Sequence, residues 1–188
     1  MKNLTEIRTK NTMHTWSKIR SKLENEYLAD SLKGHIRYFV TSYSKCHDHE
    51  GRAAILLDGK EIISGSYCEQ WSKASLLPKD ETLETRLKYE FPYMDNTAIK
   101  YGQFDQRCFY SAFYEFDNQS IEKSLNSENL LVRIFAILDR RVGKRKLNKL
   151  KSGIASEPEI FQIFYAIRTK AEGLGEMTQD TLRQEYKS

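Results

Sequence analysis

The segment that most constrains this fold runs from Leu130 to Leu138, nine residues of which only Arg133 is charged. Its composition predicts a short helix, and a helix that is apolar on nearly every side has to be buried on nearly every side. Ser127 stands just before this segment and can cap the first turn of the helix. We therefore expect this helix to be the most buried element of the protein.

A run of basic residues follows the apolar segment directly. Seven cations and no acid lie between positions 140 and 151: Arg140, Arg141, Lys144, Arg145, Lys146, Lys149 and Lys151. The whole chain carries a net charge of +4, so subtracting the +7 of this run leaves −3 for the remainder. The positive charge is therefore concentrated in one segment of an otherwise mildly acidic chain.

If residues 140–150 are helical, Arg141, Arg145 and Lys149 fall on one face at intervals of four residues. Cations on one face neutralise phosphates and release counterions, which makes binding to nucleic acid sensitive to salt. Two other interpretations stand beside this one: a solvated helix whose arginines pair with surface acids, and a docking surface for an acidic protein. At the edge of the core, Asp139 is expected to form a structural ion pair with one of the two arginines that follow it.

The N-terminal third predicts a helix followed by three antiparallel strands. Large apolar side chains recur on one face of the helix at Trp16, Ile19, Leu23 and Tyr27. Three runs of β-branched and aromatic residues follow at 35–44, 52–57 and 60–64. The pair Asp58-Gly59 predicts a tight hairpin turn between the last two runs. Because three strands need a cover on one face, the N-terminal helix is expected to pack on them.

The C-terminal half predicts helices. One helical stripe is interpreted as core and comprises Phe104, Cys108, Phe109, Ala112, Phe113 and Phe116. Short helices are expected at 67–74, from Pro78 to just before Pro92, and at 120–125. A capping box at Ser156-Glu157-Pro158-Glu159 predicts the start of a further helix, whose inner face carries Ile160, Phe161, Phe164 and Ile167.

Length and composition indicate a globular chain that can bury a core without disulfides or metals, since 188 residues include 39% hydrophobic side chains. Three widely spaced cysteines, Cys46, Cys68 and Cys108, fit free thiols in a reducing cytoplasm. No apolar run approaches the roughly 20 residues of a membrane span, and no secretory signal is recognised. Residues 1–66 and 67–188 are expected to pack as one compact cytoplasmic unit.

No recognisable catalytic set is present. The loop Cys46-His47-Asp48-His49-Glu50 is dense in metal-binding side chains. A zinc site, however, usually draws its four ligands from two separated pairs, and the sequence offers no second pair. No phosphate-binding loop or nucleophile elbow occurs either. We therefore expect no catalytic residues, no metal and no cofactor, with acid–base chemistry by His47 or His49 as a third interpretation.

Two longer stretches carry a family resemblance. The first comprises Trp16-Ser17-Lys18-Ile19, residues 28–34, His47-Asp48, Gly51-Arg52 and residues 58–62. The second runs from Ser120-Ile121-Glu122 to Leu138-Asp139-Arg140-Arg141-Val142-Gly143-Lys144-Arg145. Together they resemble a family of bacterial proteins known by a locus-style name, which also occurs on phages and other mobile elements. The resemblance covers most of residues 16–150, leaves out 151–188, and implies an accessory of mobile DNA with no activity to carry over.

The sequence thus predicts an α+β fold, with an N-terminal helix packed on a three-stranded antiparallel meander and an all-helical C-terminal half. The leading functional hypothesis is a non-enzymatic binding protein without a membrane partner. It would contact nucleic acid through Arg140, Arg141, Lys144, Arg145, Lys146 and Lys149. The alternative is a phage or mobile-element accessory protein that binds and modulates a host or defence protein.

Overall fold

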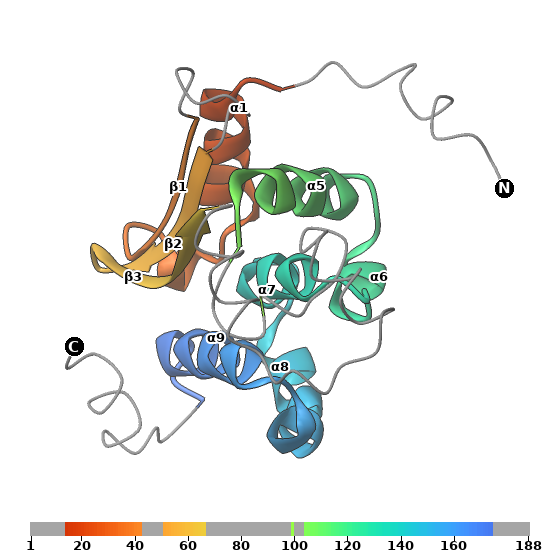
Figure 1. The fold of residues 1–188 in the computed structure, drawn as a ribbon. Coiled ribbons are helices and arrows are strands. Elements are labelled where there is room, and N and C mark those ends of the chain that lie inside the picture. The colour runs from red at the N-terminus through yellow and green to blue at the C-terminus, as the bar shows by residue number, and fades with distance from the viewer. Residues whose placement is uncertain (1–13, 43–50, 67–98, 100–103, 175–188) are drawn as a thin grey trace, which may run out of the picture.

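The computed structural model describes residues 14–42, 51–66, 99 and 104–174 (Figure 1). Its helices and strands, in chain order, are α1 (Trp16–Ser21), the π-helix η2 (Lys22–Tyr27), the short 3-10 helix η3 (Asp30–Leu32), β1 (Ile36–Ser42), β2 (Gly51–Leu57), β3 (Lys60–Ser66), α5 (Gln106–Asp117), α6 (Ile121–Leu125), α7 (Leu130–Leu138), α8 (Lys144–Leu150), the 3-10 helix η4 (Lys151–Ser156) and α9 (Glu159–Ala171). The helices predicted at 67–74 and between Pro78 and Pro92, and the loop 46–50, lie outside the described residues.

The three strands form an antiparallel sheet in the order β1-β2-β3 (Figure 1). Asp58 and Gly59 connect β2 to β3 with φ angles of 50° and 82°, the left-handed values that a two-residue hairpin turn needs. Tyr38 of β1 pairs with Ile55 of β2, and both residues are buried. With helices before and after this sheet, the predicted α+β fold is confirmed.

The N-terminal helix packs along the β1 edge of the sheet, and Ile19 and Leu23 are buried there. The carboxylate of the buried Glu24 in η2 accepts hydrogen bonds from the backbone N–H of Tyr38 (3.0 Å) and from the guanidinium of Arg37 (2.7 Å). A backbone donor on an edge strand is thereby satisfied from within the chain, which blocks pairing with another strand at this point.

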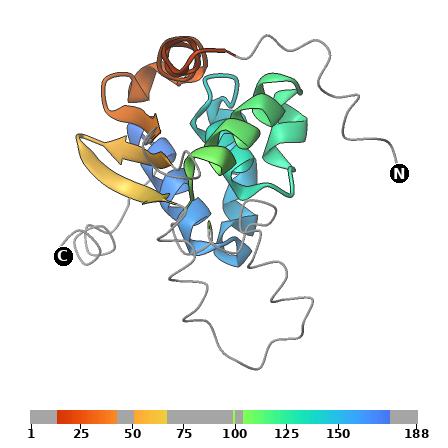
Figure 2. The ribbon, with the colours of Figure 1, turned by 45° about the horizontal axis from the view of Figure 1, so that its top comes forward.

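The helices of the C-terminal half cover the inner face of the sheet. The ring of Tyr38 packs edge-on against Phe109 of α5 (6.0 Å between centroids) and Phe135 of α7 (5.8 Å). α7 lies between α5 and α9 (Figures 1 and 2), and every one of its residues except Arg133 is buried. This confirms the prediction that α7 is the most enclosed helix, and the aromatic stripe of α5 is core as predicted. One hydrophobic cluster extends from Ile19 to Ile167.

The predicted cap of α7 was wrong by two residues. The side-chain oxygen of Asn129, not of Ser127, accepts the hydrogen bond from the backbone N–H of Leu131 (3.0 Å). The Ser127 hydroxyl donates instead to the carboxylate of Glu115 on α5. Both residue types can cap a helix, but Asn129 is the residue with extended backbone angles directly before Leu130, and Ser127 accepts a hydrogen bond from the backbone N–H of Asn129 (3.0 Å) one step earlier.

The predicted capping box before α9 was also wrong. The Ser156 hydroxyl donates to the carbonyl of Gly153 (2.8 Å) within η4, so it does not reach the first turn of α9. Pro158 occupies the N-cap position, and no side chain caps the helix. A proline there costs little, because a missing N–H in the first turn has no intrahelical partner to lose.

Candidate nucleic-acid interface

Residues 140–150 do not form one continuous helix, which was the condition for Arg141, Arg145 and Lys149 to share a face. α7 ends at Leu138, Asp139 has extended backbone angles, and α8 begins only at Lys144. The cause is local: a carboxylate oxygen of Asp139 accepts a hydrogen bond from the backbone N–H of Arg141 (2.6 Å). A side chain that binds the backbone two residues later competes with helical hydrogen bonding. Arg141 therefore does not share a helical face with the cations of α8.

The charge of Arg141 is engaged inside the protein. Its guanidinium forms a two-pronged contact with Asp139, which is 1% exposed, through Nε (3.0 Å) and NH2 (2.7 Å). The same group lies over the rings of Tyr27 (5.1 Å) and Phe116 (5.5 Å). The hydrogen bond to Asp139 raises the pKa of Arg141, against the opposing effect of burial. The predicted structural role of Asp139 is thus confirmed.

A backbone bridge joins the residues around Asp139 to the N-terminal part of the chain. The backbone N–H of Ala29 donates to the carbonyl of Leu138 (3.0 Å), and that of Arg140 donates to the carbonyl of Tyr27 (2.8 Å). The pKa of Asp30 is lowered mainly by its hydrogen bond from Lys33, and the positive charge of the exposed Arg140 side chain adds to this effect. Arg140 thus belongs to the seam with the N-terminal segment rather than to α8.

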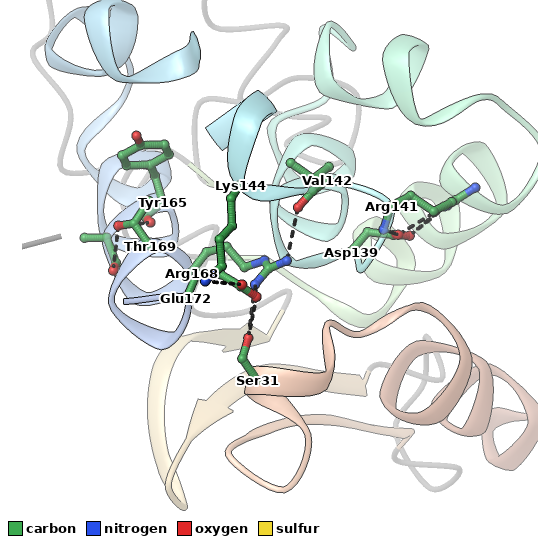
Figure 3. Close-up of polar contacts among 10 residues, drawn as sticks. Ser31, Asp139, Arg141, Val142, Lys144, Tyr165, Arg168, Thr169 and Glu172 are labelled. Atoms are coloured by element: carbon green, nitrogen blue, oxygen red, sulfur yellow. Dashed lines mark hydrogen bonds and ion pairs between the residues drawn. The ribbon is translucent and has the colours of Figure 1, made fainter. Parts of the chain in front are cut away.

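A buried arginine from α9 holds the start of α8 in place (Figure 3). Arg168 is 2% exposed and donates to the carbonyl of Val142 (3.1 Å) and to the hydroxyl of Ser31 (3.1 Å), and it also forms an ion pair with Glu172. That hydrogen bond from Arg168 lowers the pKa of Glu172, although burial acts in the other direction. Because Val142 immediately precedes the N-cap residue Gly143, this cluster fixes where α8 starts.

Sequence reasoning missed Arg168, although the signal for it was present. It stands four residues after Phe164 and seven after Phe161, so the helical period places it on the buried stripe of α9. A charged residue on such a stripe has to be paired if it is buried. Its pairing with Glu172, four residues later, could have been predicted from the helical period, but its contact with Ser31 could not, because Ser31 is 137 residues away in the sequence.

Two cations on α8 point away from the core. Leu147 is fully buried, and its carbonyl accepts a hydrogen bond from the hydroxyl of Tyr165 on α9 (2.9 Å). At about 100° per residue, Arg145 and Lys149 lie roughly opposite Leu147 and next to each other. Both are exposed, and within the described part of the chain neither forms an ion pair or a side-chain hydrogen bond.

Two further lysines, Lys144 and Lys146, flank this outer face, and each lies near one carboxylate. Lys146 pairs with the exposed carboxylate of Glu122 on α6 (2.8 Å). The Nζ of Lys144 is 3.9 Å from Glu172, beyond hydrogen-bonding distance, and its side chain is 60% exposed. Glu172 already accepts hydrogen bonds from Arg168 and Ser31. Lys144 can therefore turn toward an external anion without leaving the carboxylate of Glu172 unpaired.

A shallow hollow of about 270 Å³ lies along α8 and opens to solvent. The described residues that line it are Gly143, Arg145, Lys146 and Lys149. The three charged side chains all carry N–H donors and no acceptor, so the hollow favours an anion. Of the six predicted contact residues, three line this hollow and a fourth, Lys144, is adjacent to it. The structure separates the other two, Arg140 and Arg141, from them.

The described residues show no group of three or more His, Cys, Asp or Glu side chains arranged to hold a metal ion. The predicted metal-rich loop with Cys46, His47, Asp48 and His49 lies outside these residues, so its chemistry stays a prediction. Among the described helices, none reaches the length and apolarity of a membrane-spanning segment.

Residues 15–169 match the model of the SF0329 protein family. The chain belongs to this family. The match spans residues 16–150, over which the resemblance was drawn, and it extends through most of α9, including Arg168, which the resemblance had left out. Searches of curated proteins and of solved structures found no match.

In this SF0329-family protein, the two stretches that carried the resemblance meet in space. Leu28 and Asp139, one from each stretch, form an isolated antiparallel bridge. Ser31 of the first stretch and Val142 of the second are both hydrogen-bonded to Arg168 (Figure 3). These segments therefore build one local structure, the seam from which α8 projects.

Proposed function

We propose that this SF0329-family protein is a non-enzymatic module that binds nucleic acid through the outward face of α8. The observation that carries the proposal is the pair Arg145 and Lys149, which lies opposite the buried Leu147 and borders an open hollow. Lys144 and Lys146 extend this face on either side. Four cations on about two turns of helix can each neutralise a phosphate.

Arg140 and Arg141 are not part of the proposed contact. Arg141 is bound to Asp139, and withdrawing it would leave a buried carboxylate without its partner. Arg140 stands at the seam with the N-terminal segment. The contact surface, here called the α8 face, is therefore defined as Lys144, Arg145, Lys146 and Lys149.

The proposal is tested by charge reversal. We expect Arg145→Glu/Lys149→Glu to abolish binding of a fluorescent DNA duplex in an anisotropy titration at about 50 mM salt, where phosphate contacts are strong. Folding should survive, because both side chains are exposed and the favourable effect of a carboxylate at position 145 in the first turn of α8 offsets the unfavourable effect at position 149 in its last turn. Circular dichroism provides that check.

A matched control is available on α1. The side chains of Lys18 and Arg20 are exposed, and α1 lies at the opposite end of the molecule from α8 (Figure 1). Lys18→Glu/Arg20→Glu changes the net charge by the same amount, from +4 to 0, because each substitution removes one positive and adds one negative charge. Equal loss of binding in both double variants would mean that the overall charge of the protein, and not the α8 face, determines binding, and it would contradict the proposal.

We propose a protein-binding accessory of a phage or mobile element as the second candidate, and one observation favours it. Phe39 is the large hydrophobic side chain that stands 42% exposed among the described residues, on the outer face of β1, with the guanidinium of Arg52 6.0 Å from its ring. An exposed aromatic beside an arginine is typical of protein-contact surfaces. Cross-linking at position 39 in nuclease-treated host lysate tests this candidate, and the absence of any Phe39-dependent adduct would discard it.

A further inference from the structure

We infer that the α8 face recognises the phosphates of its ligand and not its bases. This inference rests on the proposed function and names the part of the nucleic acid that is bound. Three of the four cations are lysines, whose ammonium groups are point charges that attract phosphate without a preferred geometry. Contacts of this kind position a protein on nucleic acid but carry no sequence information.

Stacking on bases has no platform beside α8 in the part of the chain that the structure describes. Tyr165 approaches the helix, but it is 9% exposed and its hydroxyl is committed to the carbonyl of Leu147. Phe39 belongs to β1, and β1 lies away from α8 in the fold (Figure 1). Recognition of single strands through their bases relies on exposed aromatic side chains, and the described residues do not supply them beside α8.

Two side chains near the α8 face have the chemistry to read base edges. Arg145 can fork onto guanine, and Asn148, one turn after Lys144, can bind adenine. Both are exposed, and among the described residues the side chains that line the hollow beside Arg145 are two further cations, Lys146 and Lys149. The electrostatic setting of Arg145 thus matches a phosphate, which can occupy a site between several positive charges.

Conservative variants separate the two modes of recognition. A bidentate base contact by arginine loses about fivefold or more in affinity for the matching sequence when its fork is removed, whereas a phosphate contact changes affinity for every sequence alike. We therefore expect Arg145→Lys to change the affinity for two unrelated duplex sequences by the same factor, and Asn148→Ala, outside the α8 face, to bind both within about twofold of the natural protein. A loss of about fivefold or more in either variant, confined to one duplex sequence, would overturn the inference.

The ligand arm of the experiment uses two duplexes of equal length, one rich in A·T and one rich in G·C, with inorganic polyphosphate as competitor. Equal affinities for the two duplexes and displacement of both by polyphosphate are expected, since the shared chemistry is phosphate. A clear preference for one duplex, or failure of polyphosphate to compete, would overturn the inference while leaving nucleic-acid binding intact. No binding of either duplex at low salt would instead overturn the proposed function.

Discussion

Replacing Arg168 with methionine should destabilise the protein more than any change to the exposed cations of α8. The guanidinium is 2% exposed and donates to the carbonyl of Val142, to Ser31 and to Glu172. Methionine keeps much of the apolar stem but removes every donor. The carbonyl of Val142 would then lose the hydrogen bond from this guanidinium, and the carboxylate of Glu172 would lose its buried cationic partner.

The size of this effect follows from burial. Breaking a buried ion pair by removing one partner costs about 3–5 kcal/mol. The side chain of Glu172 is 19% exposed and keeps its hydrogen bond from Ser31, so the lower end applies, about 3 kcal/mol. For a protein of this length, each kcal/mol lowers the melting temperature by about 2–4 °C. The expected fall is therefore about 6–12 °C.

Thermal unfolding followed by circular dichroism measures this fall, with Lys170→Met as the matched control. Lys170 is an exposed residue of the same helix, so its replacement should change stability by less than about 0.5 kcal/mol. The double variant Arg168→Met/Glu172→Met should regain part of the loss, because no buried charge is left unpaired. A melting temperature within about 2 °C of the natural protein in Arg168→Met would refute the anchoring role assigned to this arginine.

Three further outcomes are expected. Asp139→Asn should lower stability by about 2 kcal/mol through loss of the charged contact with Arg141, and the cost should vanish in an Arg141→Ala background if that contact is the cause. Burial raises the pKa of Asp117, but the hydrogen bonds that its carboxylate accepts lower the pKa more and hold it below 3.8. The stability that Asp117 contributes is therefore present above about pH 4 and is lost as the pH falls below that value. Asp117→Asn should therefore flatten the acid side of a stability–pH curve, and an unchanged curve would contradict this assignment. Gly65→Ala should cost about 1–3 kcal/mol in urea unfolding, since its Cβ would stand 2.8 Å from the backbone carbonyl oxygen of Phe104; a stability equal to that of the natural protein would be incompatible with so close a contact.

Much of the fold was predictable because the decisive signals are local. The turn at Asp58-Gly59 and the apolar and β-branched runs on either side of it define the hairpin without reference to the rest of the chain. The apolar segment Leu130–Leu138 could only be a buried element, and it lies at the centre of the helical layer. The expected helix at Trp16 was right in its buried face, although its second half is a π-helix that ends at Tyr27.

The site was less predictable, because its geometry depends on distant partners. The sequence showed a dense run of cations, but not that Asp139 interrupts the helix and removes Arg141 from its face. Nor could it show that Lys146 meets Glu122, 24 residues away, or that Arg168 fixes the start of α8. Charge can be counted along a chain, whereas its availability is decided by tertiary contacts.

The salt dependence of DNA binding tests the central claim most directly, because it counts the phosphate contacts. Four contacts at about 0.9 each give a slope of about −3.6 in a plot of log affinity against log salt, or about a 150-fold loss between 50 and 200 mM. In Arg145→Gln/Lys149→Gln the slope should fall to about −1.8, since two contacts remain. A slope that is the same in both proteins, or close to zero in the natural one, would contradict the account.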